Sequence, residues 1–345
     1  MPAAGTFTAG CPPISRSTRQ RIMKVLITGG AGFLGQRLAK QLLSRGELTG
    51  PDGKAASITE LVLVDVVHGN DLGDKRVTAL VGDIADPALL ERAIDRDTAV
   101  VFHLAAIVSG QAEADFDLGM RINLDASRAL LEVCRARGHR PRVVFTSSVA
   151  VYGGALPEVV RDDTALNPQS SYGTQKAIAE LMLSDYSRRG FVDGVVLRLP
   201  TISVRPGRPN AAASSFASGI IREPLNGEEA ICPVPGDTRL WLLSPRRAIE
   251  ALIAGSELPG ERLGNRRIVN LPGVSVTVDE MIAALREVAG DEAANRIRRE
   301  PDARVQQIVG SWPGRWDTTR AEQLGLRGDT SFADVIRAYI EDELR

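Results

Sequence analysis

The chain has 345 residues, 43% of them hydrophobic and 25% charged, and its 42 basic and 43 acidic side chains leave a formal net charge of −1. That balance is typical of a globular protein and gives no reason to expect nucleic acid or a membrane surface as a partner. No apolar run approaches the ~20 residues of a bilayer span, and the few cysteines and histidines lack the spacing of a disulfide framework or a metal site, which favours a reducing, cytoplasmic location.

The first 22 residues differ in composition from the rest of the chain. They contain no Asp or Glu and are rich in Ser, Thr, Pro and Gly. Because such a segment has little apolar surface to bury, we interpret residues 1–22 as a disordered leader and Met23 as a candidate for the natural first residue. An organelle transit peptide has a similar composition and is the alternative.

The next segment begins with a short apolar run, Lys24 to Thr28, which ends in glycines and is followed by apolar residues at helical spacing. Similar apolar runs recur along the chain, separated by segments with helical spacing: 61–65, 77–83, 99–106, 142–148 and 194–199. Runs this continuous, without polar alternation, are typical of strands covered on both faces. The sequence therefore predicts an α/β fold, a Rossmann-type doubly wound parallel sheet over residues 23–200.

From about residue 200 the sequence becomes rich in Pro and Gly, which does not fit further regular crossovers. We therefore predict that residues 201–345 mainly form a smaller substrate-binding cap. Within them, a helical pattern at 245–256 and an apolar run at 267–271 are expected to return to the first domain. Residues 277–289 have the pattern of an amphipathic helix.

Glycines recur at positions 29, 32 and 35 in the turn after the first predicted strand. Without side chains there, the backbone and the N-terminus of the following helix can approach a pyrophosphate, so this context predicts a dinucleotide site. The second strand ends in Asp65, whose carboxylate can accept hydrogen bonds from the adenosine ribose and would repel a 2′-phosphate, so we expect NAD rather than NADP. Asp65 lies farther along the chain than is usual, and we interpret residues 46–57 as a loop insertion.

Tyr172 and Lys176 are four residues apart, a spacing that puts both on one face of a helix. Ser148 ends the predicted strand 142–148, at the edge where open α/β sheets bind ligands. The three side chains form a chemically sensible group. The lysine ammonium is expected to lower the pKa of the tyrosine toward neutrality, so that the phenolate can take a proton from a substrate alcohol held by Ser148.

Several motifs occur together in a specific order and spacing: TGGAGFLG at 28–35, GDI at 82–84, HLAA at 103–106, TSSVAVYG at 146–153 and YGTQK at 172–176. They resemble the extended short-chain dehydrogenase/reductase family, which includes NAD-dependent nucleotide-sugar epimerases and dehydratases. The resemblance implies that Ser148, Tyr172 and Lys176 are catalytic, and that a homodimer forms through the helices after Arg121 and Tyr172. We interpret His103 as structural. The implied cofactor contacts are Gly29, Gly32, Phe33, Leu34, Gly35, Asp65, Asp83, Ile84, Leu104, Ala105, Ala106, Asn123, Tyr172, Lys176 and Pro200.

Members of this family catalyse several reactions on one scaffold. The dehydratases carry an acidic pair after the residue that matches Ser148, where this chain has Val149 and Ala150, which argues against dehydration. The segments 108–132, 208–235 and 308–317 resemble family members that oxidise sugar acids. That resemblance implies NAD-dependent oxidation of the C2 hydroxyl of D-erythronate to 2-dehydro-D-erythronate.

A carboxylate substrate needs a cationic anchor, for which the planar guanidinium of arginine is well suited. Arg239 is the first candidate, and Arg205 or Arg208 is the second. The other expected substrate contacts are Ser109, Ser148 and Tyr172. Two other functions stay open: a nucleotide-sugar 4-epimerase with the same three catalytic residues, and an NAD-binding regulator without activity.

Overall fold

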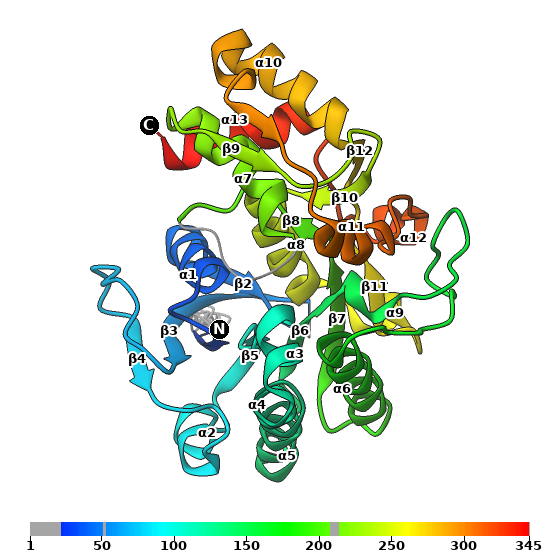
Figure 1. Ribbon diagram of the computed structural model, residues 1–345. Helices are drawn as coiled ribbons and strands as arrows, with labels where there is room; N and C mark the ends of the chain where they lie inside the picture. The colour runs from blue at the N-terminus through cyan, green and yellow to red at the C-terminus, as the bar shows by residue number, and fades with distance from the viewer. Residues whose placement is uncertain (1–21, 51–52, 208–213, 345) are drawn as a thin grey trace, which may run out of the picture.

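The computed structural model describes residues 22–50, 53–207 and 214–344, so Arg208 and residues 1–21 of the predicted leader lie outside the described residues. The described residues form a central eight-stranded sheet (Figure 1). Neighbouring strands are parallel except for the antiparallel strand at the end of the order. The order is β11 (Ile268–Asn270), β7 (Asp193–Leu199), β6 (Arg142–Ser148), β5 (Thr98–His103), β1 (Ile22–Thr28), β3 (Ala55–Asp65) and β2 (Glu47–Thr49), and β4 (Val77–Val81) also pairs with β3.

Helices cover both faces of this sheet, and the side chains of β1 show how. Val25 and Ile27 pack in the apolar cluster that contains residues of α1 (Phe33–Arg45) and α8 (Pro245–Glu257). Leu26, between them, packs on the opposite face with α2 (Pro87–Ala93), α5 (Ala126–Arg137) and α6 (Ser171–Arg188). Successive side chains of a strand point to opposite faces, so an apolar run is buried on both sides. The predicted doubly wound parallel α/β sheet is therefore confirmed.

The edge of the sheet beside β3 differs from the sequence-based expectation in two ways. Residues 46–57 are not a loop insertion, because Glu47–Thr49 pairs with residues 55–57 as an antiparallel hairpin, with Leu48 and Ala56 buried between more exposed neighbours. This alternation, with Gly53 at a φ of +73° in the turn, is the pattern of a hairpin. The expectation that every apolar run is covered on both faces is also wrong for β4. Its only strand partner among the described residues is β3, and three of its five residues are exposed.

The cap is built from segments that follow Leu199. Its centre is a three-stranded sheet of β12 (Val274–Thr277), β10 (Arg239–Leu243) and β8 (Thr201–Ile202), and β9 (Ala230–Cys232) pairs separately with β13 (Ile297–Arg299). One apolar cluster joins β10 and β12 to α7 (Ser215–Leu225), α10 (Val278–Ala294) and α13 (Phe332–Glu343), so the cap has a core of its own. The remaining helices of this half of the chain are α9 (Gly260–Leu263), α11 (Ala303–Gly310) and α12 (Thr319–Gln323).

The chain passes between the central sheet and the cap more than once (Figure 1). It leaves the sheet after β7, forms β8, α7, β9 and β10, and then returns. On its return, α8 packs on the sheet and β11 pairs with β7 in parallel, with Ile268 opposite Val196. The chain then enters the cap again at β12. Sheet and cap are therefore interleaved in the sequence.

A search of the helices in the described part of the chain finds none that is both long and apolar enough to span a membrane.

Candidate active site

Glycines let the turn after β1 pack closely against neighbouring backbone and bring the start of α1 to the end of the strand. Gly29 has a φ of +72°, and a Cβ there would lie 2.9 Å from the backbone nitrogen of Ala105. A Cβ on Gly35, in the first turn of α1, would lie 2.1 Å from the carbonyl oxygen of Gly29. Within the described residues, no side chain caps the start of α1 at Gly32. The first N–H groups of this helix can therefore bind an anion, which fits the pyrophosphate of a dinucleotide.

Asp65 ends β3 beside this turn, and backbone groups fix its carboxylate. Oδ2 accepts a hydrogen bond of 3.0 Å from the N–H of Ala31, and Oδ1 accepts one of 2.7 Å from the N–H of Val66. Each carboxylate oxygen can accept a further bond. The carboxylate is thus held in place and can still bind ribose hydroxyls.

A cavity of about 560 Å³ follows the carboxyl ends of the strands and extends to the cap, which is a size typical of small-molecule and cofactor sites. Most of the residues predicted from the sequence line it. They are Gly29, Gly32, Phe33, Leu34, Gly35, Asp65, Asp83, Ile84, Leu104, Ala105, Ala106, Ser109, Ser148, Tyr172 and Pro200. Asn123, Lys176 and Arg239 do not line it.

Ser148 and Tyr172 line this cavity, and Lys176 lies next to Tyr172 without lining it. The Tyr172 phenol interacts with Ser148, whose Oγ accepts a hydrogen bond of 3.1 Å from the N–H of Ala150. The Nζ of Lys176 lies behind them, 5.7 Å from the centre of the Tyr172 ring. It donates a hydrogen bond of 2.8 Å to the carbonyl oxygen of Thr146. The three side chains therefore meet, with Lys176 as the buried member.

The electrostatics of this group differ from the expectation. Burial raises the pKa of Tyr172 to about 12, and the hydrogen bond with Ser148 offsets this only in part. Burial also lowers the pKa of Lys176 to about 8, while the charge of Glu180 acts in the opposite direction. The expectation that Lys176 brings the pKa of Tyr172 toward neutrality is thus wrong in this structure. Burial is the main cause of the shift, and the Lys176 ammonium donates to a backbone carbonyl.

Asn123 and His103 are buried and do not line the cavity, but they form hydrogen bonds that hold nearby segments in place. Asn123 lies in the wide helical turn Met120–Asp125, and its side chain accepts a bond of 2.8 Å from the N–H of Ile107 and donates one of 3.1 Å to its carbonyl oxygen. The two ring nitrogens of buried His103 are hydrogen-bonded to Thr28 and Ser127. Burial lowers the pKa of His103 to about 3, with a smaller effect of the Lys176 charge, so the ring is neutral and its interpretation as structural holds.

The candidate arginines are placed differently. Arg239 begins β10, where its Nη1 lies 3.3 Å from Ser275 Oγ and 3.6 Å from the Glu280 carboxylate, away from the cavity lining. Arg205 follows β8 and does line the cavity. Burial lowers the pKa of Arg205, and the charge of Arg222 adds to this effect. Within the described part of the chain, the guanidinium of Arg205 has no acidic partner.

Some residues of the cavity were not predicted as ligand contacts. Arg121 lines it and forms an ion pair with Asp83. Val66 could have been found from its position directly after Asp65. Thr201, Ile202 and Ser214 come from the cap, where the sequence offers no motif that marks them.

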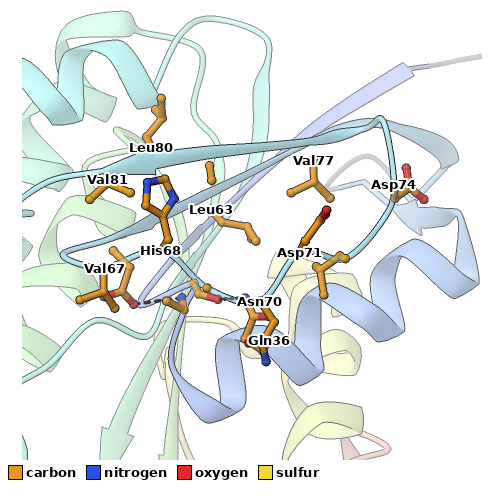
Figure 2. Close-up of a pocket in the computed structure, with 16 residues that line it drawn as sticks. Gln36, Leu63, Val67, His68, Asn70, Asp71, Asp74, Val77, Leu80 and Val81 are labelled. Carbon is orange, nitrogen blue, oxygen red and sulfur yellow. Dashed lines mark hydrogen bonds between the residues drawn. The ribbon is translucent and has the colours of Figure 1, made fainter.

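A second cavity, of about 260 Å³, adjoins the first at Asp65. Figure 2 shows Val77, Leu80 and Val81 of β4 beside it, together with His68, Asn70 and Asp71 of the connection that precedes β4. Its lining contains three carboxylates, those of Asp65, Asp71 and Asp74. Hydrogen bonds with Arg76 lower the pKa of Asp74 to about 2. The space next to Asp65 is therefore acidic.

Comparisons with known proteins agree with this geometry. The sequence model of the NAD dependent epimerase/dehydratase family matches residues 25–243. The chain is 69% identical to the D-erythronate dehydrogenase of Cupriavidus necator, over 93% of this chain and 98% of that protein. It is 48% identical to the D-erythronate dehydrogenase of Haemophilus influenzae, over 93% of this chain and 100% of that protein. The solved structure of a nucleoside-diphosphate-sugar epimerase from Agrobacterium tumefaciens is similar with a TM-score of 0.89 and 44% identity, over 99% of this chain and 98% of that one.

Proposed function

This chain belongs to the NAD-dependent epimerase/dehydratase family, and from that premise we propose that it oxidises the C2 hydroxyl of D-erythronate to 2-dehydro-D-erythronate with NAD. The high identity to two D-erythronate dehydrogenases supports the reaction. The proposed catalytic residues are Ser148, Tyr172 and Lys176.

The observation that carries the proposal is the place of Arg205. Arg205 lines the same cavity as Ser148 and Tyr172. A half-buried cation without an acidic partner among the described residues favours an anionic ligand, and a guanidinium can bind a carboxylate with two hydrogen bonds. A molecule that presents a carboxylate to Arg205 and an alcohol to Tyr172 is a small hydroxy acid. Arg205 therefore replaces Arg239 as the proposed anchor.

Tyr172 is the proposed general base. NAD, when bound, accepts a hydride. The C2–H bond breaks with its electron pair, the proton of the C2 hydroxyl passes to the Tyr172 phenolate oxygen, and a carbonyl forms at C2. Ser148 donates a hydrogen bond to the substrate oxygen. Burial raises the pKa of Tyr172 to about 12 in this structure, so the phenolate needs further stabilisation during turnover. The proposed source is the charge of Lys176, whose Nζ lies 5.7 Å from the centre of the Tyr172 ring and would act once cofactor and substrate are bound.

A preference for NAD over NADP has two supports. Asp65 ends β3 where the carboxylate can bind ribose hydroxyls and would repel a 2′-phosphate. The adjoining cavity adds the carboxylates of Asp71 and Asp74, and the latter is already paired with Arg76. A 2′-phosphate next to Asp65 would enter an acidic environment, which is unfavourable.

The direct test is to incubate the protein with NAD and a panel of four- to six-carbon sugar acids and to follow NADH absorbance. We expect NADH with D-erythronate and little with its lactone or with the neutral polyol erythritol, which lack the carboxylate. Absence of NADH with every sugar acid would overturn the proposal.

A nucleotide-sugar 4-epimerase is the second candidate, because the similar structure from A. tumefaciens is that of a nucleoside-diphosphate-sugar epimerase. It would use the same three catalytic residues, bind UDP tightly and give no net NADH. UDP titrated into an erythronate oxidation separates the two functions. Weak inhibition supports the sugar acid, whereas strong competition, or no oxidation to inhibit, supports the epimerase.

We also propose that the protein acts as a homodimer through α5 and α6, in the cytoplasm. Ile178 and Leu181 lie three residues apart on α6 and are 41% and 63% exposed, which leaves an apolar surface on that helix. The free, buried Cys134 and Cys232 fit a reducing compartment. Leu181→Glu is expected to shift the protein from dimer to monomer in analytical ultracentrifugation. A wild-type monomer at micromolar concentration would contradict the dimer.

A further inference from the structure

Lys176 is a buried cation with few polar neighbours. Only 2% of the residue is exposed, and within the described residues its Nζ has one hydrogen-bond partner, the carbonyl oxygen of Thr146. The centres of the Phe145 and Tyr172 rings lie 4.6 Å and 5.7 Å from Nζ. An ammonium in such surroundings tends to lose its proton unless a negative charge lies nearby.

Glu180 provides that negative charge. It lies one turn after Lys176 on α6, on the same helix face, and is fully buried. Its charge raises the pKa of Lys176 against the effect of burial. The other titratable groups around Lys176 do not take this role, because His103 on β5 is neutral and the pKa of Tyr172 is raised.

Arg198 of β7 holds the Glu180 carboxylate from the other side. Its Nε donates to Oε1 at 2.8 Å and its Nη2 to Oε2 at 2.6 Å, so the pair is joined by two hydrogen bonds. The Nη1 of Arg198 donates to the hydroxyl of Tyr152 and, at 3.4 Å, to Oδ1 of Asn270 on β11. Because a two-pronged pair has a defined geometry, Glu180 is fixed relative to both α6 and the sheet.

We propose that Glu180 and Arg198 are positioning residues for the reaction: Glu180 keeps the buried Lys176 side chain charged beside Tyr172, and Arg198 fixes the Glu180 carboxylate. Neither residue lines the cavity, so both act through Lys176. The proposal rests on the proposed function in one respect, the need for a charged Lys176 during turnover.

The test measures the protonation of Lys176 directly. The chain has five lysines, so NMR spectra of the full protein labelled with ¹³C,¹⁵N-lysine contain few side-chain signals. The signal that disappears in Lys176→Arg is that of Lys176. We expect Glu180→Gln to lower the pH midpoint of the Lys176 signal by about one unit or more, since a nearby opposite charge typically shifts a pKa by 1–3 units. In the pH–rate profile of Glu180→Gln, the loss of turnover at high pH should move to lower pH by the same amount. Glu180→Asp keeps the negative charge, so its Lys176 midpoint should stay close to that of the wild type.

The control is Asp193→Asn, which breaks another buried ion pair, with Arg142, without touching Lys176. It should leave the Lys176 midpoint and the pH profile unchanged. If Glu180→Gln does not fold, Glu180→Gln combined with Arg198→Met removes both buried charges and should still lower the midpoint.

An unchanged Lys176 midpoint in a folded Glu180 variant overturns the proposal, whatever the substrate proves to be. A lowered midpoint in a protein that does not oxidise erythronate supports the role of Glu180 and overturns the proposed function instead. A lowered midpoint with an unshifted pH profile in an active variant shows that turnover does not need the Lys176 charge, which overturns the catalytic part of the proposal.

Discussion

Strands β6 and β7 have a buried ion pair near each end, and the two pairs have different surroundings. Near the amino ends, Arg142 donates to Asp193 at 2.7 Å, and Arg267 binds the other oxygen of the same carboxylate at 2.6 Å. None of these three residues lines the two cavities described above. Near the carboxyl ends, Arg198 holds Glu180 one turn from Lys176. Burial alone therefore does not distinguish the two pairs. What differs is that the Glu180–Arg198 pair lies at the ligand-binding end of the sheet, one helical turn from Lys176.

The amino-end pair should matter for stability alone. Asp193→Asn leaves Arg142 and Arg267 without their shared carboxylate, and breaking a buried pair costs about 3–5 kcal/mol. We expect that decrease in the free energy of unfolding, measured by denaturant titration, with unchanged turnover per folded molecule. The exposed pair of Arg188 and Asp185 gives the matched control, because Asp185→Asn should cost about 1 kcal/mol or less. A loss of turnover in folded Asp193→Asn would show that the ion pair at the amino ends of β6 and β7 also matters for catalysis, which contradicts the comparison.

At the carboxyl end, the largest effect on chemistry is expected from Tyr172. Tyr172→Phe removes the proposed proton acceptor and should lower turnover by ~10² or more, the usual scale for loss of a general base. NAD affinity, measured by titration calorimetry, should stay nearly unchanged, because the glycine turn and Asp65 are intact. Full turnover in the folded variant would move the base to another residue.

The anchor of the substrate carboxylate gives a smaller effect. Arg205→Lys keeps the charge but loses the paired hydrogen bonds of a guanidinium, so the Michaelis constant for erythronate should rise by about tenfold. Arg239→Lys is the matched control, since Arg239 faces Ser275 and Glu280 instead of the cavity. The reverse result, with Arg239→Lys impaired and Arg205→Lys normal, would restore Arg239 as the anchor.

An effect of similar size, on cofactor choice, is expected at Asp65, at the carboxyl end of β3. Asp65→Ser removes a negative charge next to the site of the adenosine ribose and should reduce the preference for NAD over NADP by about tenfold. Asp71 and Asp74 remain in the adjoining cavity and should keep some of the preference. Ratios of kcat/KM for the two cofactors measure the change. A wild type that already used NADP as well as NAD would contradict this role of Asp65.

The parts of the site that could be predicted from the sequence depend on short segments. Gly29 and Asp65 follow or end apolar strands, Gly35 lies in the helix that follows the first of them, and parallel strands bring their carboxyl ends to one edge. Ser148 is at another such end, and the spacing of Tyr172 and Lys176 follows from the helix itself. The predicted parallel sheet was therefore sufficient to predict that these residues lie close together.

The features of the site that could not be predicted from the sequence depend on contacts between segments that are distant in the chain. The side chain of Arg239 packs against Gly314 and bonds Ser275, both far away in the sequence, so its direction could not be predicted from β10 alone. The raised pKa of Tyr172 depends on burial that several elements create together. The hairpin at residues 47–57 was missed because its paired segments, 47–49 and 55–57, are short and flank a polar, glycine-rich stretch, which also suits a loop.

The position of β11 has a consequence for how this protein is made. By the time Leu199 leaves the ribosome, β7 has been synthesised. The strand that pairs with its outer side ends only at Asn270, after β8, α7, β9 and β10 of the cap and after α8. Until then β7 is an unpaired edge, and such edges in nascent chains are prone to associate with other chains. A fragment that stops at residue 200 would keep this edge permanently and would also lack α8, which covers one face of the sheet. Expression of residues 23–200 alone should therefore yield aggregated protein instead of an independent nucleotide-binding domain.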